Sequence, residues 1–360
     1  MSDIEPSVEL TSEPTVEAKV DTPTEAKDEA STEIKDAALV EETSAAAPTA
    51  VVNKQIEYIE YEQTPFINIE DIPEDEEAIY LIQQRITVFP LMENRHALTH
   101  LCLRQNLMTD LPVVDMPNLE HLDLCDNQIP VIKGLDKLVN LKFLDMSQNR
   151  LLKIEGLTAL VKLEQLFLTY NKIRLIEGLT NNVNLKQIEL GVNKISKIEN
   201  LSHLVKMERL HLGKNKIRVI EGIETLVNLQ ILGLAANKIV KMENLDTLQN
   251  LKELHISEQG IETLDGIEKL TNLELLDLSK NFVVKIDDLQ KLPKLTDLYL
   301  NDNKIADVHS LANLGKLSDL KTLYLERNPI QTSDTGSYVR RVTSAIPSLT
   351  QLDACMVRLD

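Results

Sequence analysis

The chain has 360 residues, a formal net charge of −19 at pH 7 and an apolar fraction of 43%, which is enough for a sizeable core. It has no tryptophan and only 3% aromatic residues, so the core must be aliphatic. No apolar run approaches the roughly 18 residues that a membrane-spanning helix needs, and the start, MSDIEPSVEL, has no secretory pattern. The three cysteines lack metal-binding spacing and are expected as reduced thiols. These features predict a soluble protein of the cytosol or nucleus.

The acidic charge is concentrated at the N-terminus. Residues 1–77 carry 22 acidic and 4 basic side chains, whereas the rest of the chain is nearly neutral. Residues 1–52 consist largely of Glu, Thr, Ser, Ala and Pro and contain no aromatic residue, which predicts a disordered acidic tail. A solubilising role is favoured over a docking role for this tail. Residues 53–75 carry aromatic and aliphatic residues among acids and form either an N-terminal cap or a linker.

Residues 76–333 form a repeat array. An aliphatic residue recurs every 22 residues, at Leu122, Leu144, Leu166, Ile188, Leu210, Leu232, Leu254, Leu276 and Leu298. The same register extends back to Leu101 and Ile79 and forward to Leu323, which makes twelve units. Their consensus, LxxLxLxxNxIxxIxxLxxL, is typical of leucine-rich repeats.

The spacing predicts the fold of each unit. The alternation in LxLxxN predicts one short strand per unit, with leucines pointing inward and the residues between them outward. The threefold spacing of IxxIxxLxxL suits 3₁₀ turns or short helices on the outer face. We therefore expect an α/β solenoid: an arc of twelve units with a parallel sheet on its concave face. An Asn ends the strand in ten units, and Gln84 and Gln259 replace it in the other two; the amide can satisfy buried backbone groups of stacked loops.

Residues 334–360 are predicted to cap the C-terminal end of the array. Val339, Val342 and Ile346 have helical spacing, and Pro347 ends the helix. Leu349 and Leu352 would then cover the last strand. Such a cap is needed because a repeat unit cannot bury its own apolar face.

The outward position that follows each core residue varies along the array. It holds Cys102, Asp123, Asp145, Phe167, Glu189, His211, Gly233, His255, Asp277, Tyr299 and Tyr324. Three of the eleven are aromatic in a chain with few aromatics, and four are acidic, which favours a protein interface for a partner rich in Arg and Lys. Lysines that follow the Asn, such as Lys172 and Lys194, are matched by glutamates at the same period, such as Glu177 and Glu199. We expect these charges to compensate one another rather than bind nucleic acid.

Catalysis is disfavoured. Asp123 and Asp145 lie on adjacent predicted strands, but on an open, wet face with nothing to separate their pKa values. His211 and His255 are two strands apart, roughly 10 Å, which is too far to share one metal ion. We expect no catalytic residues, metal or cofactor.

Three segments resemble a known family: LCLRQN (101–106), LYLERNPI (323–330) and YVRRVTSAIPSLTQLD (338–353). With the twelve-unit count, they resemble the leucine-rich-repeat regulatory subunits of protein phosphatase 1. The resemblance implies a non-catalytic protein of nucleus and cytoplasm that holds the phosphatase catalytic subunit on its concave face. It implies control of phosphatase maturation, activity or localisation, a role in mitosis and chromosome segregation, and phosphatase inhibitor 3 as a third partner. We expect a monomer when free, with no nucleic acid or membrane partner.

The resemblance also implies the contact residues. They are Asp145, Phe167, Glu189, His211, Asp277, Asp297, Tyr299 and Tyr324. His211 departs from the family, which has Phe there; Tyr299 replaces Trp and Asp297 replaces Glu. The linear docking motif of phosphatase 1 is absent, since RITVF (85–89) misses its spacing, and Val88 and Phe89 are assigned to the first repeat's core. The alternative is a leucine-rich-repeat scaffold for another partner, such as a cytoskeletal, axonemal or spliceosomal adaptor.

Overall fold

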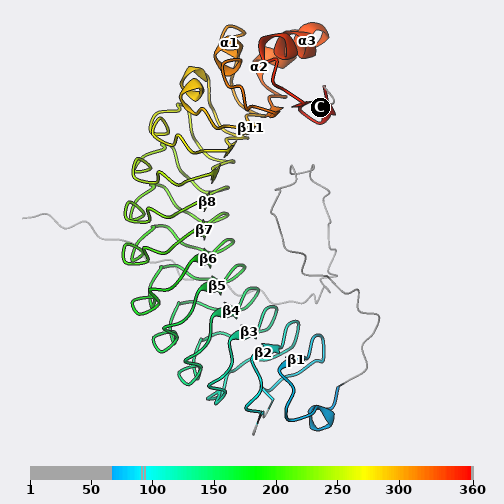
Figure 1. Cartoon of the computed structure of the whole chain (residues 1–360), viewed down its shortest axis with the longest axis vertical. Helices are drawn as coiled ribbons and strands as arrows, with labels where there is room; N and C mark the ends of the chain where they lie inside the picture. The colour runs from blue at the N-terminus through cyan, green and yellow to red at the C-terminus, as the bar shows by residue number, and fades with distance from the viewer. Residues whose placement is uncertain (1–66, 91, 93–94, 358–360) are drawn as a thin grey trace, which may run out of the picture. The chain divides into compact units, whose positions relative to one another are not determined.

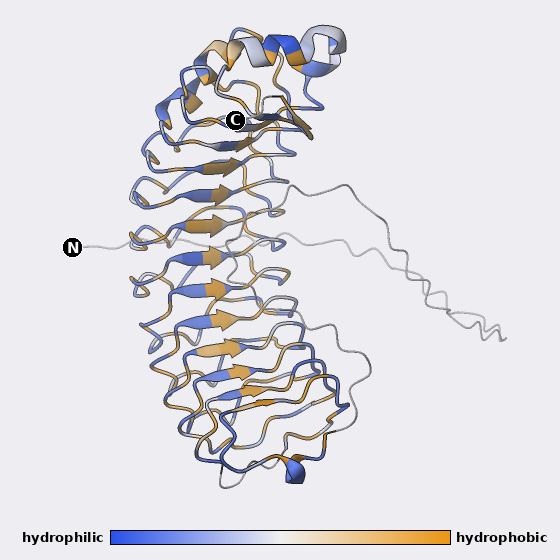
Figure 2. Ribbon diagram, turned by 45° about the vertical axis from the view of Figure 1, so that its right-hand side comes forward, coloured by the Kyte–Doolittle hydropathy of each residue, from blue (hydrophilic) through white to orange (hydrophobic). Residues whose placement is uncertain are grey.

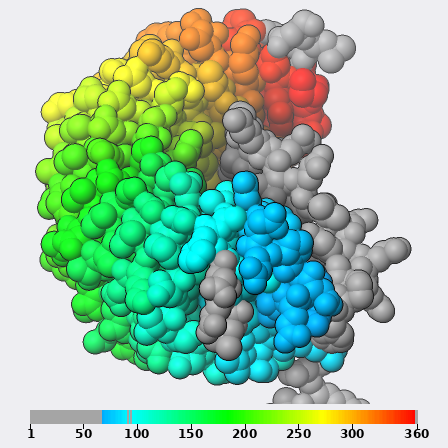
Figure 3. Space-filling view, turned by 60° about the horizontal axis from the view of Figure 1, so that its bottom comes forward, coloured from blue at the N-terminus to red at the C-terminus, as the bar shows by residue number. Residues whose placement is uncertain are grey.

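The computed structural model describes residues 67–90, 92 and 95–357. The predicted tail, residues 1–52, and residues 53–66 lie outside this part. Twelve short parallel strands follow one another in sequence order and line the inner side of the repeat array (Figure 1). On the face shown in Figure 3, successive turns pack directly against each other.

The sheet has the 22-residue register that the sequence predicts. Its strands are β1 Ala78–Tyr80, β2 His100–Cys102, β3 His121–Asp123, β4 Phe143–Asp145, β5 Gln165–Phe167, β6 Gln187–Glu189, β7 Arg209–His211, β8 Ile231–Gly233, β9 Glu253–His255, β10 Leu275–Asp277, β11 Asp297–Tyr299, β12 Thr322–Tyr324, β13 Gln351–Leu352 and β14 Cys355–Met356. The core residues stand opposite one another from Ile79 and Leu101 to Leu298 and Leu323. The twelve predicted units are therefore confirmed as twelve parallel strands.

The core is a continuous column of aliphatic side chains. In one unit, Ile188, Leu190, Ile195 and Ile198 are at most 1% exposed. Figure 2 shows hydrophobic and hydrophilic residues mixed within the same short strands, as expected when one residue faces the core and its neighbours do not. The outer side consists mostly of turns. The short helices are η1 Ile69–Asp71, η2 Asp287–Lys291, α1 Leu311–Leu314 and α2 Pro329–Thr332, and the longest is α3 Thr335–Ala345.

No helix in the described part of the chain combines the length and apolar character needed to cross a bilayer.

The asparagine ladder satisfies the backbone where each strand ends. Asn193 Oδ1 accepts from the N–H of Ile173 at 3.0 Å, and its Nδ2 donates to the carbonyls of Leu168 at 2.9 Å and Leu190 at 3.1 Å. Gln259 keeps the two bonds to the preceding unit, to Ile239 N–H at 2.9 Å and to the Leu234 carbonyl at 2.6 Å. The described contacts give it no bond to its own unit. This follows from the extra methylene of Gln, which carries the amide further toward its neighbour.

Residues 67–75 pack against the first repeats. Ile69 and Ile72 are partly buried against the core. Arg95 donates to the carbonyls of Pro73 at 2.6 Å and of Ile69 and Ile72 at 3.0 Å each. Near this end the sequence-based assignment of Val88 is wrong, because Val88 is 75% exposed and Phe89 alone is buried.

The C-terminal cap has the predicted elements but a different buried stripe. In α3 the buried residues are Tyr338 and Val342, whereas Val339 is 53% exposed, although its spacing groups it with Val342 and Ile346. The Tyr338 hydroxyl donates to Asp353 Oδ2 at 3.0 Å, which ties the buried ring to the turn between β13 and β14. β13 extends the parallel sheet beyond β12, and β14 pairs antiparallel with β13. This hairpin covers the last repeat's edge, which otherwise would expose unpaired backbone groups.

Candidate protein-binding surface

Two rows of side chains face away from the core on the concave side. Each strand has a buried central residue, and the residues on either side of it project outward; in β6, Gln187 and Glu189 flank the buried Ile188. The row after the core residue, here the inner ladder, is Tyr80, Cys102, Asp123, Asp145, Phe167, Glu189, His211, Gly233, His255, Asp277, Tyr299 and Tyr324. The preceding row, here the second row, runs from Ala78 through His100, His121 and Phe143 to Asp297 and Thr322. Tyr80, which is 56% exposed, extends the predicted ladder by one position.

Seven of the eight predicted contact residues lie in the inner ladder, and Asp297 lies in the second row. All eight are partly exposed. Phe167 stands beside Glu189, and Asp277, Tyr299 and Tyr324 occupy consecutive strands. The structure thus gathers them into two groups, separated by the strands that carry Gly233 and His255.

An aromatic stack on the N-terminal half is absent from the sequence-based prediction. The stack is described by the distances between ring centroids. This distance is 5.4 Å between His100 and His121 and 3.8 Å between His121 and Phe143. It is 5.1 Å between Phe143 and Phe167. Burial, and then the neighbouring His100, lower the pKa of His121 to about 4, so its ring is neutral at pH 7. The sequence spacing could have indicated this stack, because His100, His121 and Phe143 each directly precede the core leucine in three consecutive units.

A second aromatic pair lies near the C-terminal end. The rings of Tyr299 and Tyr324 are 5.1 Å apart and stacked. Gln351 from the cap donates to the Tyr324 hydroxyl at 2.8 Å, which holds that ring in place. Burial, and then Asp297, raise the pKa of Tyr299 to about 12, so this phenol stays neutral. Fixed, neutral rings flanked by carboxylates are suitable contact residues for a protein partner.

Asp123 and Asp145 are not on an open, wet face, and that prediction is wrong. Asp123 is only 8% exposed. Burial, followed by repulsion from Asp123, raises the pKa of Asp145 to about 6. Arg104 lies 3.4 Å from Asp123, while the described residues place no cation in an ion pair with Asp145.

The same pair approaches Cys125, with ligand atoms of the three residues within 4.8 Å of one another. These residues fit a metal ion poorly. Burial raises the pKa of the Cys125 thiol to about 12, so the thiolate that a metal prefers is hard to form. The Arg104 guanidinium already contributes positive charge beside Asp123.

His211 occupies the space left by a missing side chain. A Cβ on Gly233 would lie 2.7 Å from His211 Nδ1, so the imidazole packs over the glycine of the next strand. Burial, opposed by the charge of Glu189, lowers the pKa of His211. A flat, largely neutral ring therefore stands where the resembling family has Phe.

Comparisons with known proteins agree with this architecture. A family model described as "Leucine-rich repeat" matches residues 232–360, and one described as "Leucine Rich repeats (2 copies)" matches residues 117–159. Neither is a model of a catalytic family. A comparison with curated protein sequences gives no match.

Solved structures with the same fold include several bacterial proteins. An internalin, InlF, from Listeria monocytogenes is 23% identical, covers 78% of this chain and 88% of its own, and has a TM-score of 0.64. A leucine-rich-repeat protein of Leptospira interrogans is 24% identical, with 74% and 81% covered and a TM-score of 0.56. Internalin C2 from Listeria monocytogenes is 30% identical over 52% of this chain and 82% of its own, with a TM-score of 0.50. These similarities establish the leucine-rich-repeat fold.

Proposed function

We propose that this leucine-rich-repeat protein is a non-catalytic regulatory subunit that holds the catalytic subunit of protein phosphatase 1, a Ser/Thr phosphatase, on its concave face. The observation that carries the proposal is the inner ladder, where aromatic and acidic side chains stand on consecutive strands with partial exposure. The resemblance of residues 101–106, 323–330 and 338–353 to the family supplies the identity of the partner.

Two aromatic groups would anchor the partner at separate points. Phe167, at the end of the stack with Phe143, lies on β5, and the Tyr299–Tyr324 pair lies on β11 and β12. Seven strand spacings of about 4.8 Å separate β5 from β12, or roughly 34 Å along the sheet. A 300-residue catalytic domain is roughly 50 Å across, so it can contact both groups at once.

The acidic charges on the concave face favour a basic surface on the partner. Asp145, Glu189 and Asp277 carry carboxylates on this face, and Glu253 and Asp297 add two more. Asp145 lacks an ion-pair partner among the described residues, so a cation of the partner would relieve its unfavourable burial. An acidic face of this kind does not suit nucleic acid.

The remaining expectations follow from the resemblance. They are a location in nucleus and cytoplasm, control of phosphatase maturation, activity or localisation, and a role in mitosis and chromosome segregation. Phosphatase inhibitor 3 is the expected third partner, and the free protein is expected to be a monomer.

The direct test is complex formation between the full chain and purified phosphatase 1 catalytic subunit, followed by size-exclusion chromatography with light scattering. We expect one complex with one copy of each protein. If no complex forms at micromolar concentrations, the phosphatase assignment is wrong. Mass spectrometry of proteins captured from cell extract would then identify the partner of a cytoskeletal, axonemal or spliceosomal scaffold.

A further inference from the structure

A row of exposed basic side chains runs along the edge where the strands end. The residue directly after the ladder asparagine is basic in five consecutive units: Arg150, Lys172, Lys194, Lys216 and Lys238, here the basic row. The backbone N–H of Lys194 donates to the Ile173 carbonyl at 2.8 Å, and the other four make the equivalent bond to the unit before them. These bonds fix the backbone of the row at the strand spacing of about 4.8 Å, giving a length of roughly 19 Å.

The basic row takes no part in the ion pairs among the residues that the structure describes. Elsewhere, lysines pair with acids of a neighbouring unit, as Lys142 does with Glu120 at 2.7 Å and Lys280 with Glu258 at 2.7 Å. No member of the basic row makes an ion pair with any residue the structure describes. The periodic glutamates therefore make no direct ion pair with this row in the described part of the chain.

A second tier of basic residues follows the first by two or three positions in the chain. In the same five units this tier alternates between lysine and arginine: Lys153, Arg174, Lys197, Arg218 and Lys241. All five are exposed. Among the residues that the structure describes, Lys197 alone of these has an ion pair, with Glu199 at 3.6 Å.

Apolar side chains interleave with this second tier. Leu152, Leu175, Val219 and Val240 are 58%, 49%, 42% and 59% exposed. Exposed apolar residues among cations suit a peptide that carries both acids and apolar side chains, because each kind of group finds a complement. A nucleic-acid backbone would pair with the basic side chains but would leave the apolar side chains without a complement.

We propose that the basic row and its second tier form a second docking surface, which takes an acidic peptide segment with interspersed apolar residues from a partner protein. Like charges at adjacent strand positions repel one another, and a bound acidic segment removes that repulsion. The concave face is acidic and would reject such a segment. The two surfaces therefore select protein segments of opposite charge.

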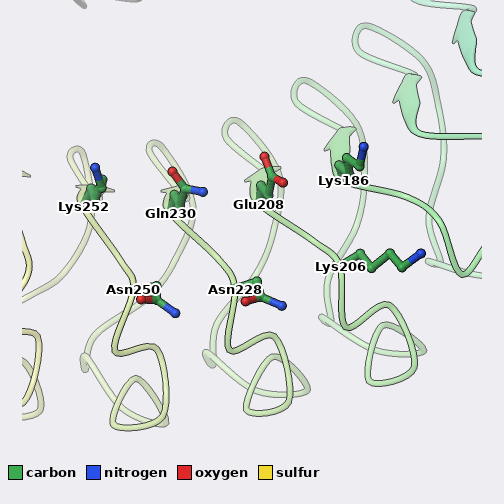
Figure 4. A pocket seen from close by; sticks show the side chains of 7 residues that line it. All are labelled: Lys186, Lys206, Glu208, Asn228, Gln230, Asn250 and Lys252. Carbon is green, nitrogen blue, oxygen red and sulfur yellow. The ribbon is translucent and has the colours of Figure 1, made fainter.

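The opposite edge of the array provides a control. A shallow hollow of about 510 Å³ lies there, with Lys186, Lys206, Glu208 and Asn228 among its lining residues (Figure 4). Its lysines are already engaged, since Lys186 bonds to Glu164 at 2.8 Å and Lys206 to Asn184 Oδ1 at 2.7 Å. Lys162 and Lys294 make the same contact to an asparagine of the preceding unit.

The test uses the full chain and fluorescence anisotropy with a labelled 12-residue peptide composed of two glutamates and one leucine in each three residues. Two triple variants are compared: Lys172→Glu, Lys194→Glu, Lys216→Glu in the basic row, and Lys162→Glu, Lys206→Glu, Lys294→Glu on the opposite edge. We expect the first to weaken peptide binding at least about tenfold, from three lost ion pairs of modest strength, and the second to leave it within twofold. A 12-nucleotide single strand should bind more weakly than the peptide.

Equal affinity of the two triple variants, or no peptide binding by the unmodified chain at 50 mM salt, would overturn the proposal. So would tighter binding of the oligonucleotide than of the peptide. If the basic-row variant does not melt like the unmodified chain, the single change Lys194→Ala replaces it, and an undiminished affinity in that variant and in Lys216→Ala counts against the proposal.

Discussion

Asp145 faces Asp123 across the β3–β4 pair, and their side-chain oxygens lie within 4.8 Å of each other. Each accepts a backbone N–H two residues further on, at 2.8 Å from Ser147 and 2.9 Å from Cys125. Arg104 compensates Asp123 at 3.4 Å but makes no ion pair with Asp145. Asp145 is thus a carboxylate held by the fold at a position where its charge is unfavourable.

The pH dependence of stability should reveal this unfavourable charge. The pKa of Asp145 is raised from 3.8 to about 6, so between these values the folded state binds more protons than the unfolded state. Its contribution therefore lowers stability as pH rises from about 4 to 6, and the full penalty persists above pH 6. We expect Asp145→Asn, which keeps the Ser147 contact, to be more stable at pH 7 by about 1–3 kcal/mol. The gain should vanish near pH 4.

The control for this prediction is Asp277→Asn. Asp277 accepts from the Ser279 N–H at 3.0 Å in the same way, but its ladder neighbours are His255 and Tyr299. Thermal melts of both variants from pH 4 to 8 provide the comparison. A stability difference for Asp145→Asn that does not change with pH would show that the paired carboxylates are not its cause.

The repeat that contains Gln259 should open more readily than its neighbours. Gln259 keeps two ladder bonds to the preceding unit, whereas Asn193 has these and two further bonds within its own unit. Fewer bonds at one unit weaken the array locally. Hydrogen exchange followed by mass spectrometry should be faster at residues 254–264 than at 188–198. Gln259→Asn should reduce the difference, and equal protection of the two segments in the unmodified chain would contradict this explanation.

Residues 67–75 should contribute to stability, although residues 1–66 should not. A chain that begins at residue 76 loses the packing of Ile69 and Ile72 and the three carbonyls that Arg95 binds. We expect its melting temperature to fall by about 3–8 °C relative to a chain that begins at residue 67, as for a loss of about 2 kcal/mol. The chain from residue 67 should melt like the full protein. Identical melting of both truncated chains would show that this segment adds nothing to stability.

The repetitive features of the structure could be predicted from the sequence. The period of 22 places Ile188 and Leu190 in the core and Asn193 at the strand end, because each position recurs with the same chemistry in almost every unit. The same alternation correctly places Glu189 on the outward row.

Features that depend on contacts between side chains of different units could not be predicted. The stack through His121 and Phe143 depends on ring orientation, and the burial of Asp123 depends on Arg104 and Cys102 around it. In the cap, helical spacing alone does not decide whether Tyr338 or Val339 faces the array, since both lie one residue apart on the same helix.

The aromatic stack leads to a prediction that the resemblance does not contain. Phe143 contacts both His121 and Phe167, so its removal leaves Phe167 without a neighbouring ring. We expect Phe143→Ala to weaken phosphatase binding at least about tenfold through loss of an ordered aromatic anchor. Binding is measured by biolayer interferometry, with melting temperature to confirm folding. Phe282→Ala, at an aromatic residue that is 50% exposed and follows a ladder asparagine, is the control and should bind normally. Equal affinity of the two variants would exclude the stack from the interface.

The central claim is that the inner ladder binds the phosphatase catalytic subunit, and single changes in the ladder test it most directly. Phe167→Ala, Glu189→Lys and Tyr324→Ala are compared with Lys206→Ala on the edge of the array, by dissociation constant for the purified catalytic subunit and by melting temperature. Because ladder residues point away from the core, all four should melt within a few degrees of the unmodified chain, unlike Leu190→Ala, whose cavity costs ~2–5 kcal/mol. We expect the three ladder variants to lose at least about thirtyfold in affinity, as for buried anchors worth about 2 kcal/mol or more, and Lys206→Ala to bind normally. Ladder variants that remain folded and bind the phosphatase as tightly as Lys206→Ala would contradict the central claim.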